Sequence, residues 1–366
     1  MRILLTTDTV GGVWTYALEL AEALAGHDVQ IALATMGAPL STSQAREAAR
    51  LSNVQVFESD YKLEWMNDPW EDVANAGRWL LDIERQFEPD VVHLNGYAHG
   101  ALPWQAPTLI VAHSCVLSWW KAVNGCDAPQ SWDRYRREVR CGIHSVDMVI
   151  APSRTMLDAI VEHYGAPAES RVIYNGRRAD AFTVPASKEP LVLTAGRLWD
   201  EAKNISRLAS IAPRLDWPVR VAGDAGHPDG GQARPEHVRM LGKLSLDQVA
   251  QWFRRAAIYV MPAKYEPFGL TILEAALSGC ALVLGNIPSL REIWGSAALF
   301  VDPDDPDALA ATIQSLTSDP GTRAEWSRRA RNRAIRYTPA RMAHGYMAVY
   351  DQLTRDMVTS ETMLQI

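Results

Sequence analysis

The sequence predicts an α/β fold with two doubly wound parallel-sheet domains. Its length of 366 residues is about twice that of an ordinary domain. Short apolar runs rich in β-branched residues alternate with longer helical patterns, and the series restarts after a polar, proline-containing stretch in the middle of the chain. Such alternation is typical of parallel sheets that are covered by helices on both faces.

The N-terminal half carries the first series of predicted strands. These are residues 2–7, 29–35, 90–95, 107–113 and 148–153. Between the first two, the pattern TYALELAEALAGH places Leu18, Ala21 and Leu24 on one stripe of a helix that ends near Gly26. We therefore expect a first domain at residues 1–178.

A second series of predicted strands follows the segment RRADAFTVPASKEP. That segment spans residues 177–190, and its proline, alanine and charged residues are typical of a linker. The strands that follow are residues 190–198, 219–224, 237–244, 257–263 and 281–286. They predict a second domain at residues 188–335. Ligands of doubly wound sheets bind beyond the carboxyl ends of the strands, so we expect the site in a cleft between the two domains.

Composition and charge argue against several classes of protein. The formal net charge of −7 disfavours a general nucleic-acid binder, because affinity for a phosphate backbone depends on basic surface. No apolar stretch reaches the roughly 18 residues that a membrane span needs. The opening MRILLTTDTVGGVW has too short an apolar core, and no small-residue cleavage site, for a signal peptide. We expect a cytoplasmic protein with at most peripheral contact with the inner face of the membrane.

Two other clusters of residues favour structural explanations. A zinc site from His113, Cys115, Cys126, Cys141 and His144 is conceivable, but their irregular spacing favours ordinary buried and reduced thiols. Seven arginines lie in the stretch from 323 to 341, and a solvated helix face explains them better than a binding patch does.

The stretch YEPFGLTILEAALSGC, residues 265–280, predicts an anion site. GLTILEAALSG predicts a helix that Gly279 ends, and Leu270 and Thr271 would lie at its start, where unpaired N–H groups and the helix dipole attract a phosphate. Glu274 can accept both hydroxyls of a vicinal diol such as a ribose, and Glu266 can accept those of a second polyol. The alternative is that Glu274 only complements the dipole and Glu266 is a solvated loop acid.

Two further motifs favour the ligand interpretation. AGRLWDEAKN follows the first strand of the second domain and places Arg197 and Lys203 where two cations can balance a diphosphate leaving group, although ordinary surface cations would explain either residue alone. TDTVGGVWTYAL places Gly11 and Gly12 between a strand and a helix, which allows a ligand to approach the backbone closely. This is not G-x-G-x-x-G, so a nicotinamide or flavin site gains no support.

Together these motifs resemble one enzyme family. EPFGLTILEAALSG, AGRLWDEAKN, the N-terminal VGGVWTYALELAEAL and the closing YTPARMAHGYMAVYDQL are similar to the retaining GT-B glycosyltransferases of family 4, glycosyl transferases group 1. The resemblance covers nearly all of the second domain and parts of the first. It implies two Rossmann-like domains that face each other across a cleft, with residues 336–366 as a terminal helix that crosses back to the first domain.

The resemblance implies a role for each motif of the second domain. Glu274 would hold the ribose of a nucleotide-sugar donor, and Glu266 would address the transferred sugar. Arg197 and Lys203 would neutralise the diphosphate as it leaves. The backbone amides that would face the sugar and pyrophosphate are those of Phe268, Gly269, Leu270 and Thr271.

The resemblance also implies contacts from other loops. LGKLS matches the family's base-binding loop, so Lys243 and Leu244 would contact the nucleobase. Gly12 would close over the diphosphate from the first domain. His113 matches the histidine that family members place beside the sugar, whereas a lone histidine at a strand end is otherwise more often structural. Asn95, at the end of a neighbouring strand, is a candidate on the acceptor side.

The resemblance implies that the anomeric configuration is kept without a covalent glycosyl-enzyme intermediate. Glu266 and Glu274 are therefore not expected to act as the carboxylate pair of a glycosidase. No D-x-D motif stands in a suitable place, so we expect no metal and no other cofactor, the nucleotide sugar being a substrate. Glycogen and starch synthases carry a lysine two positions before the paired glycines; that position is Thr9 here, which disfavours an ADP-glucose polymerase.

The segment HSCVLSWWKAVNGCDAPQSWDRYRREVR follows His113 and matches none of these motifs. Trp119, Trp120 and Trp132 could stack on a sugar or lipid acceptor, and the arginines after Asp133 could meet an anionic lipid. Asp133 and Glu138 interrupt the basic run. We therefore favour a helix with one packed aromatic side and one solvated basic side.

The sequence as a whole predicts a retaining, metal-independent hexosyltransferase. Its partners would be a nucleotide-sugar donor, with UDP-sugars favoured and GDP-mannose next, and a hydroxyl acceptor such as a glycan, a glycolipid or a small molecule. One alternative is a nucleotide-sugar 2-epimerase of the same fold, which would convert the donor without any acceptor. Another is a sugar-nucleotide-binding protein without turnover.

Overall fold

The computed structural model describes residues 1–226 and 235–364. The chain divides into two compact units. The N-terminal unit comprises residues 1–118, 127–176 and 339–366, and the C-terminal unit comprises residues 119–126 and 177–338. No helix in the described ranges is long and apolar enough to cross a membrane.

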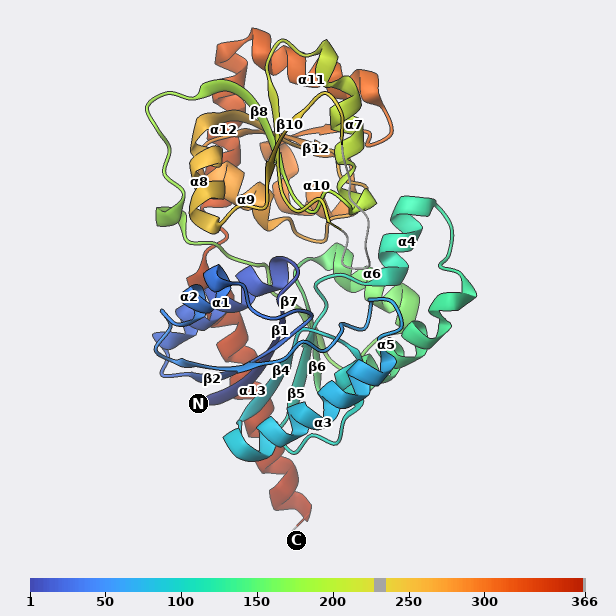
Figure 1. The fold of residues 1–366 in the computed structure, drawn as a ribbon. Coiled ribbons are helices and arrows are strands. Elements are labelled where there is room, and N and C mark those ends of the chain that lie inside the picture. The colour runs from blue at the N-terminus through green and yellow to red at the C-terminus, as the bar shows by residue number, and fades with distance from the viewer. Residues whose placement is uncertain (227–234, 365–366) are drawn as a thin grey trace. The chain divides into compact units, whose positions relative to one another are not determined.

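A parallel sheet of seven strands organises the N-terminal unit (Figure 1). In chain order its strands are β1 (Arg2–Asp8), β2 (Gln30–Met36), β3 (Val54–Glu58), β4 (Val91–Leu94), β5 (Thr108–Val111), β6 (Met148–Ala151) and β7 (Ser170–Val172). Their spatial order is β3-β2-β1-β4-β5-β6-β7. The chain thus runs outward from β1 in one direction, returns, and continues from β4 in the other, so a topological switch point lies between β1 and β4.

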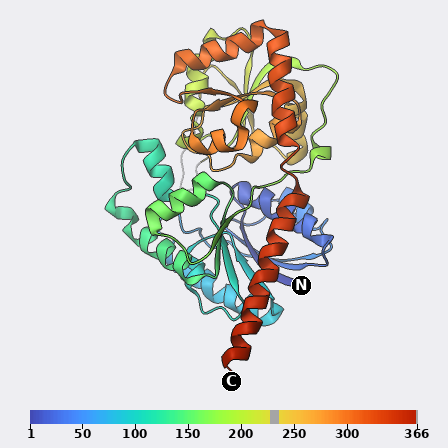
Figure 2. The ribbon, with the colours of Figure 1, turned by 180° about the vertical axis from the view of Figure 1, so that it is seen from behind.

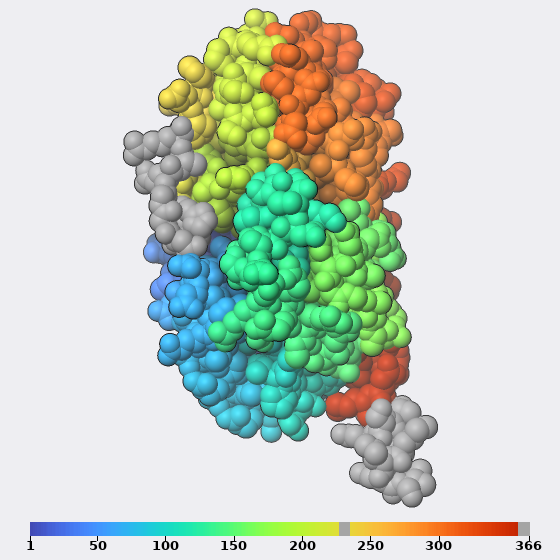
Figure 3. Space-filling model, turned by 90° about the vertical axis from the view of Figure 1, so that its right-hand side faces the viewer, coloured from blue at the N-terminus to red at the C-terminus, as the bar shows by residue number. Residues whose placement is uncertain are grey.

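The helices of this unit lie between and after its strands along the chain. One of them, α4, begins in this unit and ends in the other. They are α1 (Gly12–Ala25), α2 (Thr42–Ala48), α3 (Trp70–Phe87), α4 (Val116–Asn124), α5 (Asp133–Ser145), α6 (Arg154–Tyr164) and α13 (Pro339–Leu364). The last helix, red in Figures 1 and 2, packs against α1 and β4. Figure 3 shows α5 and α6, in green, at the surface of the unit.

The C-terminal unit contains a second parallel sheet. Its strands are β8 (Glu189–Ala195), β9 (Val219–Ala222), β10 (Arg239–Gly242), β11 (Ala256–Met261), β12 (Ala281–Gly285) and β13 (Leu299–Val301), in the order β10-β9-β8-β11-β12-β13. Its helices are α7 (Ile205–Ile211), α8 (Leu246–Arg255), α9 (Leu270–Leu277), α10 (Pro288–Trp294), α11 (Pro306–Ser318) and α12 (Pro320–Ala334). The switch point of this sheet lies between β8 and β11.

Both faces of the second sheet are buried along its central strands. Leu191 and Leu193 of β8 belong to the core layer that contains α9, whereas Val192 between them belongs to the layer that contains α7 and α11. Successive side chains of a strand point to opposite faces, so a strand covered on both sides is apolar at most positions. This is why the central strands were visible in the sequence as continuous apolar runs.

Three strands were not predicted, and all lie at sheet edges. β3 and β7 are mostly exposed, and β13 has three residues of which only Val301 is buried. An edge strand with a solvent-exposed face lacks the continuous apolar run that identifies a central strand in the sequence.

The prediction of a linker at residues 177–190 is wrong for the first part of that stretch. Arg177 and Phe182 are buried, and Phe182 belongs to the core of the C-terminal unit. The guanidinium of Arg177 lies 5.3 Å from the centre of the Phe182 ring. This stretch is part of the folded unit because an aromatic side chain and a paired arginine anchor it.

The arginine-rich stretch and the cysteines also differ from expectation. Arg328 and Arg329 pair with Glu325 on the exposed side of α12, but Arg333 donates to the carbonyl of Ile293 at 2.6 Å. Part of the stretch therefore holds neighbouring helices together. Of the thiols, Cys115 and Cys280 are buried, while Cys126 and Cys141 are exposed.

Candidate active site

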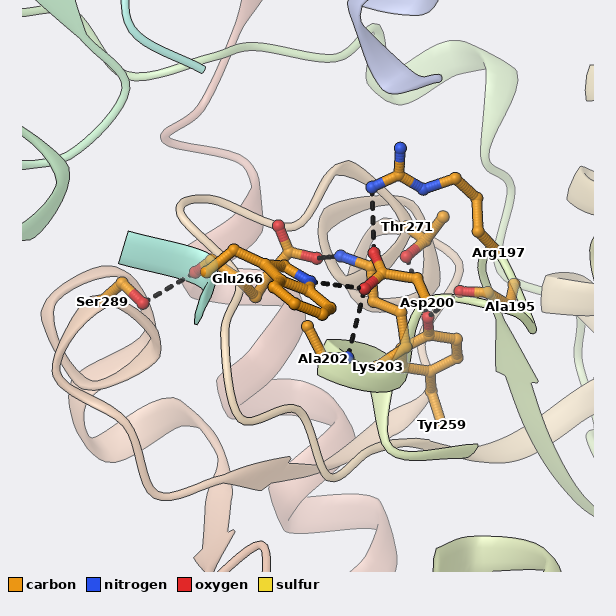
Figure 4. A network of polar contacts seen from close by, with 10 residues as sticks. Ala195, Arg197, Asp200, Ala202, Lys203, Tyr259, Glu266, Thr271 and Ser289 are labelled. Carbon is orange, nitrogen blue, oxygen red and sulfur yellow. Dashed lines mark hydrogen bonds and ion pairs between the residues drawn. The ribbon is translucent and has the colours of Figure 1, made fainter. Parts of the chain in front are cut away.

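The strand order of the C-terminal unit gathers the residues predicted for the diphosphate. Arg197 and Lys203 follow β8, and Glu266 follows β11. Because β8 and β11 are neighbours at the switch point, their carboxyl ends form the crevice in which open α/β sheets bind ligands. Figure 4 shows the resulting cluster, with Thr271 from the start of α9 beside it.

Both predicted cations already have carboxylate partners. Lys203 Nζ lies 2.7 Å from Glu266 Oε2, and Arg197 Nη2 lies 2.9 Å from Asp200 Oδ2 (Figure 4). Asp200 was not singled out from the sequence. The sequence did carry a signal for a capping role, because aspartate commonly caps a short helical turn. Asp200 caps the 3₁₀ turn Glu201–Lys203, and its carboxylate accepts from the N–H of Ala202 at 3.1 Å.

Asp200 is ionised although it is buried. Burial raises the pKa of its carboxyl, but Lys203, Arg197, and hydrogen bonds from Trp119 and from the N–H of Ala202 lower it further, and the net shift is downward. The Trp119 indole N–H donates to Asp200 Oδ1 at 2.9 Å. Trp119 is therefore in contact with the cluster that contains the residues predicted for the diphosphate.

Trp120 differs from its neighbour in its polar contacts. The two rings are 6.2 Å apart and tilted by 60°. The indole N–H of Trp120 is buried and forms no hydrogen bond within the described part of the chain.

The loop that carries Glu266 is held at both ends. Ser289 Oγ donates to the Glu266 carbonyl at 2.7 Å (Figure 4). Gly269 caps α9 with a φ of 85°, and a Cβ at this position would lie 2.6 Å from Ile272 Cδ1 and 3.3 Å from Glu266 Cγ. Only glycine fits this conformation and this space. It lets α9 begin at Leu270, so the predicted helix start is confirmed.

The start of α9 is tied to the end of β8 through Tyr259. The Tyr259 hydroxyl lies 3.1 Å from the carbonyl oxygen of Ala195 and 2.9 Å from Thr271 Oγ1. The first N–H groups of a helix have no partner within it. In α9 these groups, which include those of Leu270 and Thr271, are thereby held beside Arg197 and Lys203.

Glu274 has a partner that the sequence did not suggest. Its Oε1 lies 2.9 Å from Arg177 Nε, and both side chains are almost fully buried. An opposite charge at this distance stabilises the ionised carboxylate. No sequence pattern links the two residues, since Arg177 comes from the predicted linker.

The predicted base-binding loop also lies at the carboxyl edge of this sheet. Lys243 and Leu244 directly follow β10, the neighbour of β9. Lys243 is exposed, and its Nζ is 3.8 Å from Asp224 Oδ2. Leu244 is partly buried against the core.

In the N-terminal unit the predicted residues follow three adjacent strands. Gly11 and Gly12 follow β1, Asn95 follows β4, and His113 follows β5. Asp8 Oδ1 accepts from the N–H groups of Val10 at 3.0 Å and of Gly11 at 2.8 Å, which shapes the turn into α1.

Asn95 and His113 are bonded to each other, and their contacts define the state of the imidazole. Asn95 Nδ2 donates to the Thr6 carbonyl at 2.6 Å, so Asn95 Oδ1 faces His113 Nε2 at 2.7 Å. Because an amide oxygen only accepts, His113 carries its proton on Nε2. Burial lowers the pKa of His113 to about 3, and the edge of its ring packs against Tyr16. At neutral pH its Nδ1 is therefore an acceptor.

The segment after His113 has the two sides that the sequence predicted for it. Tyr135, Val139 and Ile143 of α5 are buried, whereas Arg137 and Arg140 are exposed. Trp132 packs edge-on against Tyr135 with ring centres 5.7 Å apart. The possible zinc ligands do not gather: within residues 1–226 and 235–364, histidine, cysteine and acidic side chains form no group of three or more that could hold a metal ion.

Comparisons with known proteins find relatives that cover both halves of the chain. The family described as Glycosyltransferase Family 4 matches residues 10–180, and the family described as Glycosyl transferases group 1 matches residues 177–333. A glycogen synthase of Mycobacterium tuberculosis is 30% identical over 91% of this chain and 90% of its own length. A D-inositol 3-phosphate glycosyltransferase of Streptomyces bingchenggensis is 24% identical over 95% of this chain and 86% of its own.

Solved structures show the same fold. A sucrose-phosphate synthase of Thermosynechococcus elongatus superposes with a TM-score of 0.82 at 19% identity, covering 97% of this chain and 100% of that structure. The Anabaena protein Alr3699/HepE, solved in complex with UDP and glucose, gives a TM-score of 0.74 at 16% identity and covers 96% and 100%. The fold, the two family matches and the glycogen synthase relative agree: the chain belongs to the glycosyl transferases group 1 family of GT-B glycosyltransferases.

Proposed function

We propose that the protein is a retaining hexosyltransferase that moves a hexose from a nucleotide-diphosphate sugar to a hydroxyl acceptor without a metal ion. The observation that supports this most is the cluster of Arg197, Lys203 and Glu266 beside the start of α9, at the switch point of the C-terminal sheet. It provides two cationic side chains and N–H donors in one crevice, which are the groups that can stabilise a departing diphosphate.

Each group then has a distinct task. Arg197, Lys203 and the first amides of α9 hold the charge that develops on the diphosphate as the bond to the anomeric carbon stretches. Glu266 orients the sugar hydroxyls, and Glu274, which is paired with Arg177, accepts from the ribose. The departing phosphate takes the proton of the acceptor hydroxyl, so neither glutamate serves as nucleophile or general base.

The residues of the N-terminal unit contribute to the sugar side. His113 presents an unprotonated Nδ1, which can accept a hydrogen bond from a sugar hydroxyl, and Asn95 holds the ring in that tautomer. Gly12 leaves room for the diphosphate at the start of α1. Lys243 and Leu244 contact the base.

We favour a UDP-sugar as the donor, with GDP-mannose next. The Anabaena protein of the same fold was solved with UDP and glucose, which supports this order. The acceptor is a glycan, a glycolipid or a small molecule. Since relatives are named for glycogen and for D-inositol 3-phosphate, a glucan and an inositol phosphate belong in the acceptor panel. We place the activity in the cytoplasm.

Nucleotide binding is the first test. Thermal unfolding with UDP, GDP and ADP in parallel should show stabilisation by one of them, about 2.7 kcal/mol at a concentration 100 times Kd. The Glu274→Ala variant should lose most of this stabilisation. Nucleotide-sugar panels with the acceptors above should then release the matching diphosphate, and NMR of the product should show the anomeric configuration of the donor.

Two outcomes would overturn the proposal. One is no diphosphate release with any donor, together with unchanged nucleotide binding by Glu274→Ala. The other is conversion of the donor in the absence of acceptor, with solvent deuterium entering the sugar, which would identify the 2-epimerase. An inverted product would remove only the retaining mechanism.

A further inference from the structure

Asp200 lies between Trp119 and Arg197, beside the residues proposed to hold the diphosphate. Its side chain is 4% exposed, and its two oxygens have separate partners. Oδ1 accepts from the Trp119 indole N–H at 2.9 Å and from the N–H of Ala202 at 3.1 Å, while Oδ2 faces Arg197 Nη2 at 2.9 Å. One oxygen thus anchors the carboxylate in the protein, and the other holds a cation.

Arg197 depends on this contact for its position. About a third of its side chain is exposed, and besides Asp200 it contacts the face of Trp199, 4.9 Å from the ring centre. A guanidinium has several N–H donors. Within the described residues only one of them makes a hydrogen bond, the one to Asp200. Figure 4 shows the guanidinium beside the Asp200 carboxylate.

The cluster is also balanced in charge. Arg197 and Lys203 contribute two positive charges, and Asp200 and Glu266 contribute two negative ones, so the four side chains sum to zero. Two bare cations side by side would repel each other and move apart. The carboxylates allow both to be held in place before any ligand arrives, which is the condition for electrostatic catalysis.

We propose that Asp200 is a positioning residue for the transfer reaction proposed above: it holds the Arg197 guanidinium in place for the leaving diphosphate, and Trp119 orients the Asp200 carboxylate. The proposal rests on that function. Asp200 does not touch the donor. The negative charge of Asp200 slightly weakens the attraction between the cluster and the diphosphate in the ground state. Because Asp200 holds Arg197 in place, it favours the reaction as charge develops on the leaving group.

Asp200→Asn tests this directly. The amide oxygen can still accept from Trp119 and Ala202, so the anchor remains, but the charge that holds Arg197 is lost. We expect kcat to fall by about tenfold or more, since a misplaced donor to a developing anion costs up to about 100- to 1,000-fold. Affinity for UDP, GDP or ADP, whichever the protein binds, should stay unchanged or become tighter.

Glu201→Gln is the matched control. Glu201 is the next residue, is exposed, and loses the same charge without touching Arg197. Its kcat and nucleotide affinity should stay within about twofold of wild type, because an exposed charge is screened. Trp119→Phe, which keeps the aromatic ring but removes the N–H, should lower kcat less than Asp200→Asn does and leave nucleotide affinity unchanged. Trp120→Phe, compared by nucleotide affinity and melting temperature, controls for loss of an indole in this segment.

The outcomes separate the two proposals. Wild type that releases no nucleoside diphosphate overturns the proposed function and this inference with it. If the wild type is active and Asp200→Asn has the same kcat as Glu201→Gln, that result overturns the inference alone. So does an Asp200→Asn variant in which kcat, nucleotide affinity and melting temperature all fall together, because that pattern indicates a structural role. Wild-type kcat in Trp119→Phe overturns the role assigned to Trp119.

Discussion

At the residue scale, two neighbouring arginines form ion pairs that differ in burial. Arg177 and Glu274 are almost fully buried, whereas Arg178 and Asp180, next along the chain, are largely exposed. Charge pairs in water contribute little to stability, but a buried charge that loses its partner is costly. The two neighbouring arginines therefore make a matched pair for experiments.

Arg177→Met should destabilise the C-terminal unit by about 3–5 kcal/mol, because it leaves the Glu274 carboxylate buried without its cation. Arg178→Met should change stability by at most about 1 kcal/mol. Thermal unfolding measured on both variants checks this. Equal melting temperatures would show that the Arg177 pair is not the buried contact described above.

His113 makes a pH-dependent contribution to stability. Burial lowers its pKa to about 3 from an ordinary value of 6.5, so the unfolded chain takes up a proton where the folded protein does not. Stability due to this group is fully present above pH 6.5 and is lost as the pH falls toward 3. Burial lowers the pKa of His93 as well, and proximity to His113 adds to that shift, so both act in the same direction.

Replacing His113 by Gln should therefore flatten the loss of stability below pH 6.5. Denaturant unfolding followed from pH 8 to pH 4.5 measures the slope, which one such group can change by at most about 1.4 kcal/mol per pH unit. His27→Gln, at an exposed position, serves as the control and should keep the wild-type slope. An unaltered slope in His113→Gln would contradict the buried neutral imidazole.

At the element scale, the position of α9 depends on one glycine. Gly269 combines a positive φ with a close approach to Ile272 and Glu266. Gly295 also has a positive φ, but a Cβ added there would have nothing within 4 Å. Backbone strain alone and strain with a steric clash can thus be separated within one unit.

Gly269→Ala should cost about 1–3 kcal/mol in stability and weaken nucleotide binding, because the clash displaces the helix start beside Lys203 and Glu266. Gly295→Ala carries only the strain of the positive φ and should leave nucleotide affinity at the wild-type value. Thermal unfolding with and without the bound nucleotide measures both effects. Wild-type nucleotide affinity in Gly269→Ala would show that α9 tolerates the shift.

At the scale of the whole molecule, the end of the chain completes the first sheet's core. Tyr350 of α13 approaches His93 Nδ1 of β4 at 2.7 Å, and His93 Nε2 lies 3.2 Å from the Tyr16 hydroxyl of α1. All three side chains are buried. Residues separated by more than 250 positions thus share one polar network, which the N-terminal unit cannot form without its last helix.

Tyr350→Phe should destabilise the N-terminal unit by about 1–3 kcal/mol, because it leaves a buried imidazole nitrogen without its partner. Tyr346→Phe is the comparison: its hydroxyl interacts with the Tyr16 hydroxyl, whereas the ring nitrogens of His93 face Tyr350 and Tyr16, so its removal should cost less than removal of the Tyr350 hydroxyl. Hydrogen exchange of β1 and β4 localises the effect. Equal protection in both variants would contradict the network.

The sequence by itself determined the strand and helix series, the helix start at Leu270 and the motifs that carry Arg197, Lys203 and Glu266. These were visible because apolar periodicity, glycine and capping chemistry are local. Only the tertiary structure decided the partners: Asp200 and Trp119 at Arg197, Arg177 at Glu274, and Tyr350 at His93. The physical reason is that strand order brings together residues far apart in the chain, and no local pattern encodes which strand lies beside which. The edge strands β3, β7 and β13 were missed for a related reason, since they lack the two-sided burial that makes a strand apolar throughout.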